Sequence, residues 1–130
     1  MEVVESEGVK YAPGLSLNFS GEIPEQLGLV TDGDGLSAVT RLEGEYDLEG
    51  LKKIEFSDYI SSALGFHLIQ NIDNQRKILI IGPGGGLDIL GGIYNEAEEI
   101  WGIEMNPDVK ILLQGNYSDY SGNIYNREEI

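Results

Sequence analysis

The residues most suited to chemistry lie in a glycine-rich stretch and one carboxylate beyond it. Gly82-Pro83-Gly84-Gly85-Gly86 follows the apolar run Ile78–Ile81. A glycine turn between a strand and a helix lets a ligand reach backbone N–H groups at the positive end of the helix dipole. Glu104 comes 22 positions after Gly82, at the end of the next predicted strand. A carboxylate there can accept hydrogen bonds from ribose hydroxyls, so the pattern predicts a nucleoside ligand.

The glycine spacing separates two kinds of nucleotide turn. The dinucleotide fingerprint G-x-G-x-x-G needs a third glycine where this chain has Leu87. The spacing that fits is G-x-G-x-G, at Gly82, Gly84 and Gly86. A glycine run by itself is weak evidence for a ligand site. The alternative is therefore a turn whose glycines serve packing alone.

The elements around this turn follow a β-α-β-α order. The continuous apolar run Ile78–Ile81 is typical of a strand buried on both faces of a parallel sheet. Leu87–Tyr94 is predicted to be the next helix, and its two internal glycines would allow close packing. A second short strand ends at Glu104, and Asn106-Pro107 begins another helix. This order predicts the front half of a doubly wound α/β sheet.

The N-terminal third is predicted to be β-structure and turns. Alternating Leu15, Leu17 and Phe19 favour a half-buried strand. The stretch "LGLVTDGDGLSAVTRL" favours a hairpin around Asp32-Gly33-Asp34-Gly35, with apolar residues on one face at Leu27, Leu29 and Val39. The Asp-Gly repeat lacks the later ligands of an EF-hand loop, so we predict no metal site.

A helix is predicted between the hairpin and the glycine turn. Its apolar positions recur at three- and four-residue steps, with Ser57 as N-cap, and they are Phe56, Ile60, Ala63, Leu64, His67 and Leu68. His67 is the only histidine, and we interpret it as packed or half-exposed, with a functional role as the alternative.

Composition limits the classes of function. The chain has 130 residues, 41% of them hydrophobic, which suits one globular domain of ordinary size. It has no cysteine, which excludes thiol chemistry, and its net charge of −15 disfavours nucleic acid as a partner. No apolar run reaches the roughly 18 residues of a membrane span. We therefore expect a soluble, cytoplasmic protein with no membrane partner.

At these residues a family resemblance becomes visible. "ILIIGPGGGLDIL…WGIEMNP" resembles the first two motifs of S-adenosylmethionine-dependent methyltransferase folds, and it is most similar to the spermidine-synthase-like branch, the polyamine aminopropyltransferases. "LVTDGDG" resembles the Leu-Asp-Gly hairpin of that branch, and "EFSDYISSALGFHLI" resembles its Asp-Glu-x-x-Tyr-His-Glu helix. The tail "YSDYSGNIYNREEI" is similar to the segment before its third sheet strand.

The resemblance implies a fold, a cofactor and a set of binding residues. The fold would be an N-terminal β-hairpin region, residues 1–50, followed by a partial Rossmann-like domain, residues 51–130, that binds S-adenosylmethionine or its decarboxylated form. The residues implied to bind this cofactor are Gly82, Pro83, Gly84, Gly85, Gly86, Glu104 and Met105.

The chain also departs from the family pattern. Ile80 occupies a place that is usually acidic in methyltransferases, although the aminopropyltransferase branch tolerates an apolar residue there. Gly85 stands where the family has an Asp that contacts the amine substrate, and Leu36 stands near the place of a hairpin Gln. The Tyr-His pair of the family falls near Asp58-Tyr59. The catalytic residue is therefore unknown; Asp88 is a weak candidate that could instead cap its helix.

The family would continue beyond Ile130 with an adenine-contacting Asp and a catalytic Asp motif. We therefore expect a fragment, a degenerate short homologue or an obligate oligomer, in which a homodimer covers Trp101, Ile103 and Ile111–Leu113. Three interpretations stay open. In the first, the chain binds the nucleoside cofactor without complete catalytic machinery. In the second, it is an active methyl- or aminopropyltransferase that uses Asp88, Tyr59 or groups from missing sequence or a partner. In the third, it is a non-catalytic interaction module.

Overall fold

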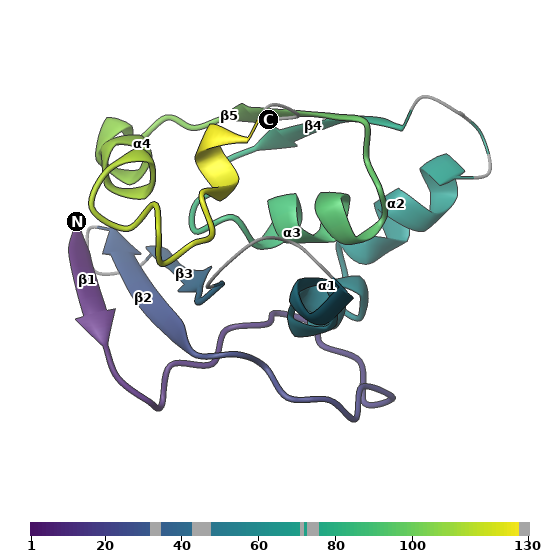
Figure 1. The fold of residues 1–130 in the computed structure, drawn as a ribbon, viewed down its shortest axis with the longest axis horizontal. Coiled ribbons are helices and arrows are strands. Elements are labelled where there is room, and N and C mark those ends of the chain that lie inside the picture. The colour runs from purple at the N-terminus through teal and green to yellow at the C-terminus, as the bar shows by residue number, and fades with distance from the viewer. Residues whose placement is uncertain (32–34, 43–47, 71, 73–75, 128–130) are drawn as a thin grey trace.

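The computed structural model describes residues 1–31, 35–42, 48–70, 72 and 76–127. These residues form an α/β fold with a three-stranded antiparallel sheet, a two-stranded parallel sheet and four α-helices (Figure 1). In Figure 1 the parallel sheet lies at the top and the antiparallel sheet at the lower left, with α3 between the parallel sheet and α1. No helix within the described ranges is both long and apolar enough to cross a membrane.

The antiparallel sheet contains the predicted hairpin. Strands β2 (Gln26–Thr31) and β3 (Gly35–Thr40) pair with Leu27 opposite Val39, and β1 (Glu2–Glu5) adds an edge strand on β2. The hairpin's predicted inward residues Leu27, Leu29 and Val39 are all buried. Asp32, Gly33 and Asp34, the tip of the hairpin, lie outside the described residues.

The strand expected at Leu15–Phe19 is wrong. This segment forms successive turns instead, in which Leu15 N–H donates to Ala12 O and Phe19 N–H to Ser16 O. Gly14 has φ +70°, a conformation that ends an extended segment. The side chain of Leu17 is fully exposed, so the alternating pattern does not mark a buried face.

The single helix expected from Phe56 to Leu68 is also wrong. The chain forms α1 (Leu48–Ile54), a 3₁₀ turn η1 (Glu55–Asp58) and then α2 (Ala63–Gln70). Tyr59 O accepts a hydrogen bond of 2.8 Å from Ser16 N–H, so this carbonyl is taken out of the helical ladder. Ser57, the predicted N-cap, is buried, and its hydroxyl donates to Ile54 O over 2.6 Å.

The interruption changes which residues face the core. Ile60, Ala63 and Phe66 are buried, whereas Leu64 and Leu68 are more than half exposed, at 64% and 54%. The predicted apolar stripe therefore turns partly toward solvent, because α2 begins in a new register after the break.

The β-α-β-α unit is confirmed. Strand β4 (Lys77–Ile81) and strand β5 (Glu99–Ile103) pair in parallel, and α3 (Leu87–Tyr94) connects them. Helix α4 (Pro107–Gln114) follows, with the Asn106 side chain accepting from Asp108 N–H over 3.0 Å as an N-cap.

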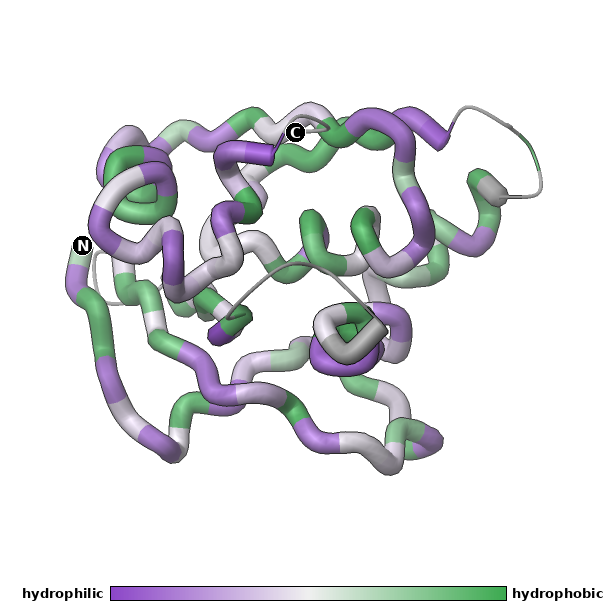
Figure 2. The backbone as a smooth tube through the Cα atoms, viewed as in Figure 1, coloured by the Kyte–Doolittle hydropathy of each residue, from purple (hydrophilic) through white to green (hydrophobic). Residues whose placement is uncertain are grey.

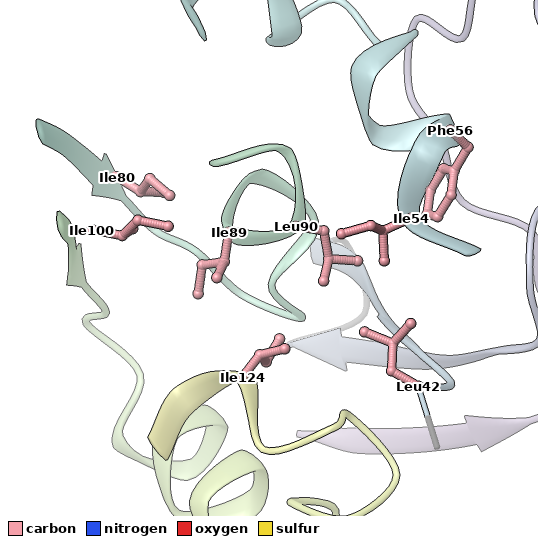
Figure 3. Close-up of a cluster of buried hydrophobic side chains, with 8 residues drawn as sticks. All are labelled: Leu42, Ile54, Phe56, Ile80, Ile89, Leu90, Ile100 and Ile124. Carbon is pink, nitrogen blue, oxygen red and sulfur yellow. The ribbon is translucent and has the colours of Figure 1, made fainter. Parts of the chain in front are cut away.

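Only one face of the parallel sheet is buried, so burial on both faces was a wrong expectation. Ile80 and Ile100 point toward Ile89 on α3 (Figure 3). The other face is exposed, because no described helix covers it (Figure 1). Its exposed apolar side chains, here called the outer face, are Leu79, Ile81, Trp101 and Ile103.

Two buried clusters form the core. The larger joins α3 and both parallel strands to Leu42, the α1–η1 segment and Ile124 (Figure 3). The smaller packs α4 on the hairpin through Val109 and Leu113. Leu113 is therefore fully buried rather than short of cover as expected, whereas Ile111 is 69% exposed. In Figure 2 the green of hydrophobic residues is seen on α3 and on strands β4 and β5 above it, which agrees with the larger cluster.

The glycines of α3 allow the close packing that the sequence predicts. A Cβ on Gly91 would lie 2.5 Å from the ring of buried Phe66, whereas a Cβ on Gly65 in α2 would meet no atom within 4 Å.

We expect Gly91→Ala to lower the free energy of unfolding by about 1 kcal/mol or more, because overpacking outweighs the gain in helix propensity. Gly65→Ala is the matched control and should raise it by about 0.5–1 kcal/mol. Urea denaturation followed by circular dichroism measures both. A stabilising Gly91→Ala would show that α3 does not pack this closely on α2.

Candidate functional site

The glycine stretch forms the predicted turn from strand to helix. Gly82 N–H donates to Ile103 O over 2.8 Å, and Gly86 N–H donates to Pro83 O over 2.8 Å. Gly82, Gly84 and Gly86 have φ values of +71°, +50° and +93°. The G-x-G-x-G spacing therefore matches three alternate positions in the left-handed region, where other residues are strained.

Glu104 and the glycine turn meet as predicted. Glu104 Oε2 accepts from Gly84 N–H over 3.0 Å, and Oε1 accepts from Asn106 N–H over 2.8 Å. This contact joins the carboxyl ends of the two parallel strands. Each carboxylate oxygen has a second lone pair, so the group is held in place and can still accept a hydrogen bond from a ligand.

Strand β3 closes the turn from the opposite side. Ser37 Oγ accepts from Gly85 N–H over 2.7 Å. A Cβ on Gly85 would overlap the carbonyl oxygen of Ala38, and a Cβ on Gly84 would lie 2.6 Å from Ser37 Oγ. Gly85, which stands in place of the family's amine-contacting Asp, therefore has no room for a side chain.

Tyr125 is a member of the site that sequence reasoning missed. It lies in the 3₁₀ turn η2 (Ile124–Asn126), and its hydroxyl donates to Gly84 O over 2.5 Å. Burial, and secondly the negative charge of Glu104, raise the pKa of the Tyr125 phenol above its usual value. The hydroxyl therefore stays a donor at neutral pH. Nothing in the local sequence marks this tyrosine among seven.

The predicted cofactor-binding residues differ in their exposure. Gly82 is exposed and has open space where a Cβ would point, and Met105 is 92% exposed. Gly84 and Glu104 are partly buried. The remaining three are buried within the turn: Pro83, Gly85 and Gly86. Direct access to a ligand is therefore best at Gly82, Glu104 and Met105.

The weak catalytic candidates are engaged elsewhere. Asp88, in the first turn of α3, accepts from Ser62 Oγ over 2.6 Å. Tyr59 packs its ring against Phe19, with centroids 5.2 Å apart. Neither makes a described hydrogen bond with the glycine turn.

His67 and Asp58 tie the helical segments together. His67 Nε2 lies 3.1 Å from Asp58 Oδ1, which also accepts from Asn95 Nδ2 over 2.8 Å. This interaction links α2, η1 and the end of α3, which agrees with a structural interpretation of His67. Leu36, near the place of the family's hairpin Gln, is 49% exposed.

Comparison with known proteins adds no assignment. The chain matches no protein-family model, and neither the curated proteins nor the solved structures gave a match. Among the described residues there is also no group of three or more side chains suited to hold a metal ion. A functional assignment therefore depends on the geometry of the glycine turn and Glu104.

Proposed function

We propose that this chain is a spermidine-synthase-like protein with a Rossmann-like methyltransferase fold, and that it binds S-adenosylmethionine or decarboxylated S-adenosylmethionine. The main support is the hydrogen bond between Gly84 N–H and the Glu104 carboxylate. It brings the glycine turn after β4 and the acid after β5 to one place. Ligands of open α/β sheets bind at the carboxyl ends of such strands.

Each accessible residue has a role in this proposal. Gly82, exposed and in the left-handed region, lets the ligand approach the backbone closely. Glu104 accepts hydrogen bonds from the ribose hydroxyls, and Met105 offers apolar surface beside it. The net charge of −15 favours cationic ligands. Decarboxylated S-adenosylmethionine lacks the carboxylate of its parent, so it is the more cationic of the two and the better match.

We propose binding without aminopropyl transfer by the described residues alone. Transfer requires an amine held and deprotonated in line with the sulfonium carbon. Gly85 leaves no room for the carboxylate that the family uses, and Asp88 already accepts from Ser62. Acid–base groups for an active transferase would have to come from other sequence or from a partner.

Isothermal titration calorimetry with both cofactors tests this proposal. We expect saturable binding by the unmodified chain and about tenfold weaker binding by Gly82→Ala, because the added Cβ projects into the open side of the turn and an alanine at φ +71° strains the turn. Gly65→Ala, whose Cβ also meets open space but lies in α2, is the control for an added methyl group away from the site and should bind normally. No saturable heat with the folded chain, or equal affinity of Gly82→Ala and the control, would refute this site.

A second candidate function is protein interaction through the outer face. Leu79 pairs in register with Trp101, and Ile81 with Ile103, and all four are at least 53% exposed. We propose that a second copy of the chain covers these side chains by face-to-face sheet packing, which places sheets about 10 Å apart.

Analytical ultracentrifugation tests this homodimer. Trp101→Glu should abolish association, whereas Leu64→Glu, which changes an equally exposed residue on α2, should not. We expect association to strengthen with salt, because the charge of −15 on each copy is then screened. A strict monomer at high salt and high protein concentration would contradict the proposal.

A further inference from the structure

A cleft of about 520 Å³ lies away from the glycine turn. Its walls come from the N-terminal loop at Lys10, the segment before β2, Arg41 after β3, and Lys52 and Lys53 at the end of α1. Figure 1 shows two of the segments that line the cleft, α1 and the loop that leads into β2, as neighbours. The volume is in the range of small-molecule sites.

The charge of this cleft is opposite to that of the chain. The chain has only eight Lys and Arg against 23 Asp and Glu, yet four of the eight line this one cleft. Two carboxylates, Glu22 and Glu25, also line it, and Glu25 is paired with Arg41 over 2.7 Å. The lining therefore keeps an excess of positive charge on a strongly acidic protein.

Two of the cations are fixed by their surroundings. Lys10 Nζ donates to Ile23 O over 2.7 Å and to Pro24 O over 2.9 Å. An ammonium has three donors, so one is left for a ligand. Arg41 is held by Glu25 and lies over the ring of Tyr120, 5.8 Å from its centroid. These groups need little ordering when a ligand binds.

The other two cations are adaptable. Lys52 and Lys53 are exposed in the last turn of α1, and neither makes an ion pair with a described residue. The negative end of the helix dipole favours ammonium groups at this position. Their side chains can therefore close on an anion that the fixed cations have bound.

We propose that this cleft binds a phosphorylated small molecule. A phosphate group offers several acceptor oxygens to converging ammonium and guanidinium donors. Ile23 and Pro24, both partly buried, provide an apolar wall for the rest of the ligand. This proposal is independent of the nucleoside site, because the cleft shares no residue with the glycine turn.

Calorimetric titration with inorganic pyrophosphate tests the proposal on the full chain. Pyrophosphate should bind saturably, and Lys52→Gln/Lys53→Gln should weaken binding by about tenfold or more. Lys77→Gln/Lys110→Gln is the matched control, because it removes the same charge outside the cleft and should leave affinity within about twofold. Lys10→Met should also weaken binding, while circular dichroism shows that the variant is folded.

Citrate, a polycarboxylate, serves as the second probe and should bind more weakly than pyrophosphate. The proposal is overturned by an absence of saturable pyrophosphate binding up to about 10 mM, far above the range of Kd in which specific metabolite sites work. It is likewise overturned if both double variants lose affinity equally, or if citrate binds more tightly than pyrophosphate.

Discussion

The bond from Gly84 N–H to Glu104 stands at the centre of a set of contacts on which the arrangement of the two sheets depends. Glu104 holds one side of the glycine turn, and Ser37 on β3 holds the other through Gly85 N–H. Tyr125 closes the turn by donating to Gly84 O. Because the turn has almost no side chains, β3 can approach its backbone directly. A single turn thus joins the hairpin to the β-α-β unit.

These contacts explain how a glycine turn can serve packing and binding together. Gly85 packs against β3, Gly86 packs against η2, and Pro83 is buried beside Gly102 of β5. Gly82 and one side of Glu104 stay toward solvent. The packing interpretation therefore accounts for part of the motif, and the proposed nucleoside site uses the remainder. The cationic cleft, by contrast, depends on the other end of β3, where Arg41 follows the strand.

Short stretches of sequence predicted those helices and strands whose conformation depends mainly on neighbouring residues. The pairing of β2 with β3 follows from the alternation of apolar residues along both strands, and α3 has the predicted bounds Leu87–Tyr94 because the glycine turn and the next strand limit it. The glycine turn from strand to helix was also predicted, although the positive φ values of Gly82, Gly84 and Gly86 were not. By contrast, the break before α2 depends on Ser16 N–H donating to the distant Tyr59 O, which no short window contains.

Contacts between residues distant in sequence also limited the prediction of the site. Spacing was enough to place Glu104 beside the turn, but not to show that the Ala38 carbonyl excludes a side chain at Gly85 or that Tyr125 reaches Gly84. On the outer face, the exposure of Trp101 and Ile103 was predicted and is confirmed. The exposure of Leu79 and Ile81 was not predicted, because a continuous apolar strand looks the same whether one face or both are covered.

The most direct test of this account is hydrogen exchange of the Gly84 amide measured by NMR, in the unmodified chain and in Glu104→Gln. We predict that the Gly84 amide is protected, that Glu104→Gln lowers this protection while the Gly92 amide within α3 keeps its own, and that decarboxylated S-adenosylmethionine shifts the Gly84 resonance. A Gly84 amide that exchanges in the unmodified chain as fast as in an unstructured peptide would contradict the account.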